Sequence, residues 1–431
     1  MTEVKENYMK TRVYYGEYTL RHWLNLMLTR NIDLPEYQRS FVWEEADVKR
    51  LVESLRTGQF IMPVTIAHYQ NGDVGRNLIL DGQQRLTSIL LAFLGYMPRK
   101  EMFNESDDNL AHGDDSREDD SPLGMTMEWT YKYLLEKNVQ ENTVEKIKER
   151  LRDNPRYSKL VVTFEEKIED FYEKTFLGFS FIIPNSSEAK ETQRYFSTLF
   201  RNMNYLGKKL SSLESRRSLY FLNDDYKNYF DGRLENGEDV LCGIRIVENM
   251  MPRKIDFVRY LSMLSQYMVV KNHDMWRVMV GYSAYSSRES YYADYVSYVV
   301  SLEQESRKDK FNGFDMNKTF PNQDWKERFV IVRDFLEKNK NKLGLDEKNH
   351  AFTSWIDADY WLYGLLYYVV FKGRYLSREQ ELIEEIKKEI HAKRWQRERG
   401  ILTEYQRNPN RIGNLRDRIE RSLLIYSHYA E

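Results

Sequence analysis

Cysteine, a charge excess and long apolar runs are nearly absent from this sequence, and each absence excludes a class of protein. Cys242 is the only cysteine in 431 residues, which excludes a disulfide framework and a zinc site built from several cysteines. A formal net charge of −2 excludes a surface that is basic throughout, so any contact with DNA must come from local patches. The longest apolar run, residues 360–371, is too short to cross a bilayer and predicts a buried helix.

The N-terminus has no apolar core and therefore does not resemble a signal peptide. A chain with one cysteine also suits a reducing compartment. We therefore expect a cytoplasmic protein with no membrane partner.

The first part of the chain predicts alternating helices and strands. Helices are expected where apolar residues recur on one face, and strands where short apolar runs lie between turn residues. Asn71-Gly72 is a hairpin-type turn between two such runs. The expected helices cover 44–55, 83–94 and 188–203, and the expected strands cover 64–69, 78–80 and 176–184.

Beyond about residue 235 the strand patterns fade and helical patterns dominate. The sequence therefore predicts an α+β protein with a small mixed sheet in residues 1–235 and a larger, mostly helical domain in residues 236–431. Because the strand patterns fade there, we expect this second domain to be all-helical. An acidic insertion interrupts the first domain at about residues 101–122, where nine acids accompany a single base. We expect this insertion to be solvated.

The segment Asp-Gly-Gln-Gln-Arg at 81–85 is the strongest candidate site. It lies where a strand passes into a helix, and the first amides of a helix lack backbone partners and carry partial positive charge. Gly82 lets a ligand approach the backbone closely, and Arg85 offers a bidentate cationic fork. Asp81 is then available to hold a metal or to orient a water. The alternative is a plain turn closed by an ion pair between Asp81 and Arg85.

Two further segments complete a pattern with 81–85. Residues 34–43 read Leu-Pro-Glu-Tyr-Gln-Arg-Ser-Phe-Val-Trp, and residues 200–211 read Phe-Arg-Asn-Met-Asn-Tyr-Leu-Gly-Lys-Lys-Leu-Ser. In this order, the three segments resemble the N-terminal domain of GmrSD-type modification-dependent restriction systems. That domain is related in fold to the nucleotide-binding core of ParB and to sulfiredoxin. The resemblance covers roughly residues 15–235.

The resemblance implies nucleoside triphosphate binding and hydrolysis coupled to attack on foreign DNA. Its implied ligands are GTP, ATP or CTP with Mg²⁺ or Mn²⁺, the metal being held by Asp81. Such roles suit phosphoryl transfer, which needs cations on the phosphate oxygens and a positioned water. The implied catalytic residues are Asp81, Gln84 and Arg85, and the implied nucleotide-binding residues are Tyr37, Gln38, Arg39, Gly82, Gln83, Asn204 and Lys208.

We therefore predict a nucleotide-dependent component of an anti-phage restriction or defence system. One alternative is a ParB-like switch that binds nucleotide without hydrolysing it and recruits a nuclease. Another is a metal-dependent DNA-nicking enzyme that uses the same pocket. Members of the family often carry a C-terminal HNH nuclease, but none of the seven histidines lies in such a stretch. The expected partners are phage or modified DNA, a separate HNH-type subunit, and a second copy of the chain.

A basic stretch near the C-terminus is a second candidate for DNA binding. Residues 387–421 contain eleven bases and five acids. Arginines beside a tryptophan can bind a nucleic-acid backbone and stack on bases, which favours Lys393, Arg394 and Arg397 as contacts. The alternative is a solvated helix that pairs these charges internally.

Overall fold

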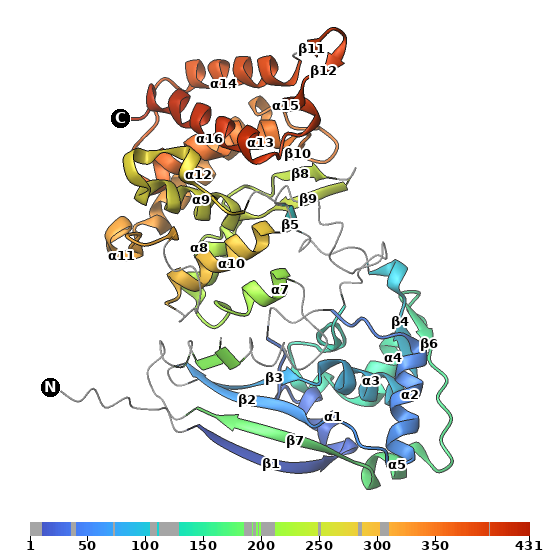
Figure 1. Cartoon of the computed structure of the whole chain (residues 1–431). Helices are drawn as coiled ribbons and strands as arrows, with labels where there is room; N and C mark the ends of the chain where they lie inside the picture. The colour runs from blue at the N-terminus through green and yellow to red at the C-terminus, as the bar shows by residue number, and fades with distance from the viewer. Residues whose placement is uncertain are drawn as a thin grey trace, which may run out of the picture. The chain divides into compact units, whose positions relative to one another are not determined.

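The computed structural model forms two compact units, shown in Figure 1. The first comprises Met1–Ser106 with Ser121–Leu210, and the second comprises Asp107–Asp120 with Ser211–Glu431. The division at 210/211 thus lies before the boundary predicted near residue 235. The structure describes residues 11–35, 40–71, 74–103, 110–111, 129–184, 192, 195–196, 198–199, 212–248, 251–282, 287–301, 310–395 and 397–431.

The first unit contains a mixed four-stranded sheet in the order β1-β7-β2-β3. β1 pairs antiparallel with β7, β7 pairs parallel with β2, and β2 pairs antiparallel with β3. The order brings the hairpin of β2 and β3 beside a strand that arrives about a hundred residues later. The strands are β1 (Arg12–Thr19), β2 (Val64–Asn71), β3 (Val74–Asp81) and β7 (Phe176–Ile183).

Helices next to this sheet bury its apolar residues. Trp23 is fully buried, and its indole nitrogen donates to the carbonyl oxygen of Leu177 on β7 at 3.1 Å. The hydroxyl of Tyr172 donates to the carbonyl of Ile89 at 2.8 Å, so a buried polar group on α5 is satisfied by α3. The helices are α1 (Leu20–Leu28), α2 (Glu45–Arg56), α3 (Gln83–Leu94), α4 (Val144–Arg152) and α5 (Ile168–Lys174), and a small hairpin pairs β4 (Tyr96–Pro98) with β6 (Tyr157–Lys159).

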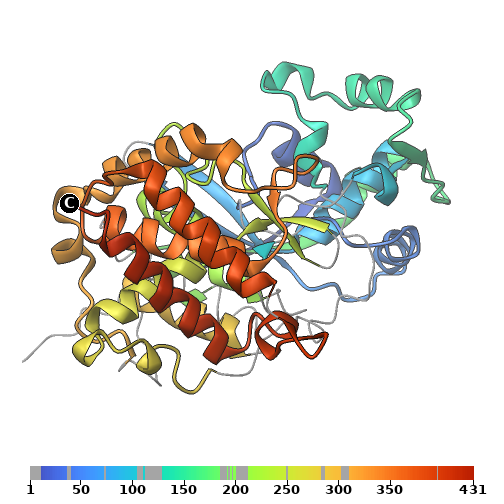
Figure 2. The ribbon, with the colours of Figure 1, turned by 90° about the horizontal axis from the view of Figure 1, so that it is seen from above.

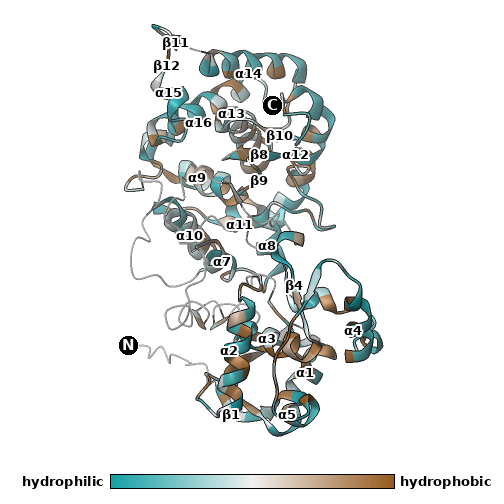
Figure 3. Ribbon diagram, turned by 90° about the vertical axis from the view of Figure 1, so that its right-hand side faces the viewer, coloured by the Kyte–Doolittle hydropathy of each residue, from teal (hydrophilic) through white to brown (hydrophobic). Residues whose placement is uncertain are grey.

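The second unit is mostly helical. In Figure 2 the red helices α14 and α16 run side by side, and both also pack against α13. α14 is largely hydrophilic in Figure 3, with only its Leu382, Ile383 and Ile386 buried. The helices are α7 (Ser212–Arg217), α8 (Asp224–Asp231), α9 (Phe257–Val269), α10 (Arg288–Val299), α11 (Met316–Thr319), α12 (Trp325–Asn339), α13 (Trp355–Leu365, continued by a π-helix over Leu366–Phe371), α14 (Glu379–Arg394), α15 (Glu404–Arg407) and α16 (Ile412–Ser427).

A second four-stranded sheet, in the order β10-β8-β9-β5, corrects the prediction that this half is all-helical. β5 and β10 span only two residues, and β8 and β9 carry charges and, in β9, a proline, so these strands lack the alternating apolar pattern that identifies a strand. One strand, β5, comes from the acidic insertion. The strands are β5 (Leu110–Ala111), β8 (Arg245–Glu248), β9 (Met251–Ile255) and β10 (Ala351–Phe352), and β11 (Arg397–Glu398) pairs with β12 (Ile401–Leu402) in a separate hairpin.

Three fully buried charges connect the helices of the second unit. Asp359 on α13 accepts hydrogen bonds from Arg259 on α9 and from Arg418 on α16, at 2.5–3.0 Å. Burial disfavours the charged carboxylate, but the two guanidinium groups outweigh it and hold the pKa of Asp359 below its usual value. The three helices therefore depend on one another for charge compensation.

The predicted class, α+β with a larger and mostly helical second part, is confirmed. Among the described helices, none combines the length and apolar character needed to cross a membrane.

Candidate functional site

The strand-to-helix junction at residues 81–85 is built as the sequence predicts. β3 ends at Asp81, and α3 covers Gln83–Leu94 before a C-cap at Gly95. Gly82 between them has φ 96° and ψ 6°, a conformation that favours glycine. A Cβ atom there would lie 2.9 Å from the Val64 side chain and 3.3 Å from its Cα atom. Glycine at this position thus allows the close approach of β2, an internal requirement in addition to any approach by a ligand.

The N-terminus of α3 keeps its partial positive charge. No side chain caps it, and its first turn contains no acid. All but one of its residues are buried, including Gln83 and Gln84 with 6% and 8% exposure. The dipole of a well-anchored helix therefore begins at the junction, as anion binding requires.

Gln84 joins residues 81–85 to the segment at residues 34–43. Its Oε1 atom accepts from the backbone nitrogen of Val42 at 2.9 Å, and its Nε2 atom donates to the carbonyl oxygen of Ser40 at 3.0 Å. The side-chain amide thus pairs with the chain in the manner of a neighbouring strand. Ser40 directly follows Arg39 in the sequence. Gln84 therefore holds the backbone immediately after residues 37–39, which are predicted to bind nucleotide. Its geometry makes it a positioning residue.

Asp81 and Arg85 form an ion pair, with 2.6 Å between Oδ2 and Nη2. The Nη1 atom of Arg85 donates to the carbonyl oxygens of Met62 and, at 3.4 Å, Pro63. The side chain of Asp81 is 51% exposed and that of Arg85 only 13%. The carboxylate is thus open to solvent, whereas the guanidinium is anchored to the segment before β2. The ion pair that the plain-turn alternative predicts is therefore present, at a junction that is also suited to anions.

Five of the predicted nucleotide-binding residues lie outside the described residues, so the structure places neither them nor their contacts. They are Tyr37, Gln38, Arg39, Asn204 and Lys208. The predicted helix over 188–203 also falls largely there. In the described residues, no group of three or more His, Cys, Asp or Glu side chains is arranged to hold a metal ion. A single exposed carboxylate such as Asp81 suits Mg²⁺ only in combination with phosphate oxygens.

The basic stretch near the C-terminus has its charges partly paired. Lys393 contacts Asp417 and Arg394 contacts Asp357, each at 2.8 Å. Burial raises the pKa of Asp357 to about 6, although Arg394 opposes the shift. α14 ends at Arg394, and Arg397 lies exposed on β11. Of the three predicted DNA contacts, two are thus occupied by acids.

Comparison with known proteins concerns the unit that carries this junction. Residues 21–221 match the family model described as GmrSD restriction endonuclease, N-terminal domain. These residues form a GmrSD N-terminal domain. The match includes all three sequence segments and ends near the division between the two units. No curated protein and no solved structure gave a match to the chain.

Membership of the GmrSD N-terminal family has a functional consequence at a coarse level. The family is described as part of a restriction endonuclease, so the chain is a component of a restriction, or defence, system. DNA is the partner class that such a system implies. The GmrSD match covers none of the last two hundred residues, which contain most of the second unit.

Proposed function

We propose that this chain is the nucleotide-dependent component of a restriction system. In this proposal the GmrSD N-terminal domain binds a nucleoside triphosphate (GTP, ATP or CTP) with Mg²⁺ or Mn²⁺ at residues 81–85. Hydrolysis is then coupled to engagement of phage or modified DNA. A separate HNH-type nuclease subunit and a second copy of the chain are the proposed protein partners.

One observation carries the proposal. The amide of Gln84 holds the end of the first segment against the N-terminus of α3, so that two of the three family segments meet at one corner. The partial charge of that helix end attracts phosphate oxygens. The exposed Asp81 carboxylate is the oxygen ligand through which this corner would hold a divalent metal, whose contribution when bound is to neutralise charge on the phosphates.

Arg85 has a defined part in this proposal. Two backbone carbonyls hold its Nη1 atom, so the guanidinium stays in place when its partner changes. Its Nη2 atom, which contacts Asp81 here, can turn from the carboxylate to a phosphate oxygen with little movement of the side chain. Arg85 thereby combines a structural role with the stabilisation of charge on the transferred group.

A non-hydrolysing switch is the second candidate, and a specific observation favours it. The side chains of Gln84 and Arg85 are largely committed to contacts within the domain, which leaves Asp81 as the exposed polar group of the three. A site with few exposed catalytic groups is better suited to binding than to rapid turnover. The two candidates differ only in whether the bound nucleotide is hydrolysed.

Phosphate release by the purified full-length chain distinguishes these functions. The chain is incubated with each nucleotide and Mg²⁺, with and without duplex DNA. Release that DNA stimulates and that Asp81→Asn abolishes supports the triphosphatase, with Asp170→Asn, an exposed acid of the same unit, as the matched control. Binding without release supports the switch. Nicking of a plasmid without nucleotide would contradict both and support a DNA-nicking enzyme.

A further inference from the structure

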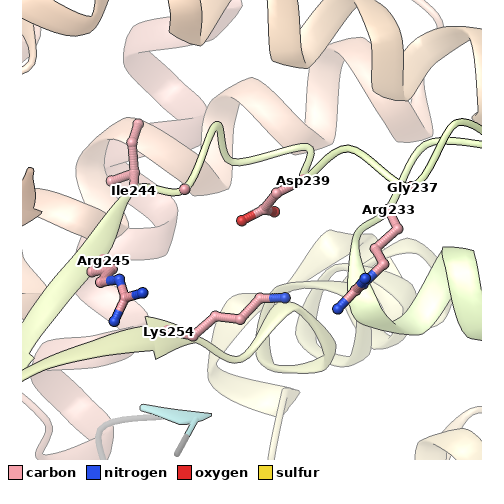
Figure 4. A pocket seen from close by; sticks show the side chains of 7 residues that line it. Arg233, Gly237, Asp239, Ile244, Arg245 and Lys254 are labelled. Atoms are coloured by element: carbon pink, nitrogen blue, oxygen red, sulfur yellow. The ribbon is translucent and has the colours of Figure 1, made fainter. Parts of the chain in front are cut away.

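The second unit contains a hollow of about 210 Å³ whose lining is mainly cationic. Figure 4 shows the side chains of Arg233 and Lys254 extending toward one another, with the carboxylate of Asp239 directed into the space above them. The hollow lies between β8, β9 and the loop that connects α8 with β8. Its polar and glycine lining consists of Arg233, Gly237, Asp239, Gly243, Arg245 and Lys254.

The charges of this hollow are not balanced from within. Three cations face one acid, a local net charge of about +2 when all four groups are ionised. In the described part of the chain, neither Arg233 nor Lys254 forms an ion pair, and the buried Nε atom of Arg233 has no hydrogen-bond partner. Asp239 uses one carboxylate oxygen to accept from the backbone nitrogen of Leu241 at 3.1 Å. The acid thus stabilises its own loop and leaves the two cations uncompensated.

The strand register concentrates positive charge further. Arg245 on β8 lies directly opposite Lys254 on β9, and like charges in opposed positions destabilise an antiparallel pair. On the loop side, Gly237 and Gly243 have open space where a Cβ atom would be, so a ligand can approach the backbone there. Opposed like charges in the sheet, together with Arg233 and Lys254 that form no ion pair among the described residues, are explained if an anion occupies the hollow.

We propose that this hollow binds a phosphate group. A phosphate group supplies the negative charge that Arg233 and Lys254 lack, and arginine and lysine are the side chains that recognise phosphate. The volume is below the 300–1,000 Å³ of pockets that enclose whole drug-sized ligands, so one phosphate enters and the rest of its carrier stays outside. The carrier is either a free nucleotide or a nucleic-acid backbone. The site is separate from residues 81–85 and does not depend on the function proposed for them.

Titration of the full-length chain with inorganic phosphate tests this site. Melting temperature and calorimetric heat are followed for the wild type, Lys254→Met and Arg233→Met. We expect saturable binding by the wild type and a loss of about tenfold or more in affinity for each variant, since a hydrogen bond to a charged group is worth that much. Lys254→Arg keeps the charge and is expected to retain binding. Lys318→Met removes an exposed lysine of the same unit as a control.

Two further readouts separate a ligand role from a structural one. Asp239→Asn removes the acid of the described lining but keeps an oxygen for the Leu241 nitrogen, so phosphate binding should tighten. Without phosphate, Lys254→Met should melt no lower than the wild type, because it removes a like-charge pair. If duplex DNA competes with phosphate, the site binds a phosphate of the nucleic-acid backbone. If nucleotide competes with phosphate in an Asp81→Ala background, the site binds the phosphate of a free nucleotide. Absence of phosphate binding by the wild type, or unchanged binding in both methionine variants, would overturn the proposal.

Discussion

Replacing Gln84 by alanine tests how the first two family segments are held together. The variant leaves the nitrogen of Val42 and the carbonyl of Ser40 without their protein partner. A buried backbone group without a partner costs about 1–3 kcal/mol. Both residues are only half-buried, so water can reach them and the lower figure, about 1 kcal/mol, applies to each of the two groups. We expect a loss of about 2 kcal/mol in the local free energy of opening, or about thirtyfold in the opening equilibrium.

Amide hydrogen exchange at Val42 measures this loss directly, because exchange reports local opening. We expect the Val42 amide of Gln84→Ala to exchange about thirtyfold faster than that of the wild type. Gln84→Glu still accepts from Val42 but cannot donate to Ser40, so it should keep most of the protection at Val42. Gln59→Ala, at an exposed position of the same unit, should change nothing. Equal exchange in Gln84→Ala and the wild type would refute the role given to this amide.

Three further predictions concern stability. Asp359→Ala leaves Arg259 and Arg418 buried without their counter-ion, so urea unfolding should show a loss of about 3–5 kcal/mol in the second unit; a loss under about 1 kcal/mol would contradict the buried network. Because the pKa of Asp357 is raised to about 6, the folded state holds a proton that the unfolded state releases between about pH 4 and pH 6. Melting temperatures should therefore fall as pH rises through this window, and a slope unchanged in Asp357→Asn would be inconsistent with that cause. Gly82→Ala should cost about 2–4 kcal/mol from strain and contact with β2, against about 1 kcal/mol for Gly95→Ala, which meets no close neighbour; similar melts for the two variants would argue against the close approach.

The elements around the candidate site were predictable because their residues follow simple rules. The apolar face of 83–94 and the glycine at 95 identify α3, and the structure gives it those bounds. Asn71-Gly72 and its apolar flanks likewise identify the hairpin of β2 and β3. The short strands of the second unit were not predictable, because two residues are too few to show a period and the longer strands β8 and β9 are interrupted by charges or proline.

The contacts of the site depend on tertiary structure and were therefore missed. Nothing in the sequence shows that the carbonyls of Met62 and Pro63 meet Arg85, or that Arg85 is thereby largely buried while Asp81 stays exposed. The pairing of Gln84 with the backbone near residue 41 joins positions more than forty residues apart. The cationic hollow likewise combines a loop with two strands that were not expected. The nucleotide-binding roles of residues 37–39, 204 and 208 stay predictions.

Thermal melting of the full-length chain with ATP, GTP, CTP or UTP and Mg²⁺ tests the central claim most directly. At a hundred times its dissociation constant, a nucleotide that binds only the folded state stabilises it by roughly 2.7 kcal/mol. We predict such a shift for at least one nucleotide in the wild type and in Asp170→Asn, and its loss in Asp81→Ala. If no nucleotide shifts the wild type, or if Asp81→Ala responds as the wild type does, residues 81–85 do not form the nucleotide site.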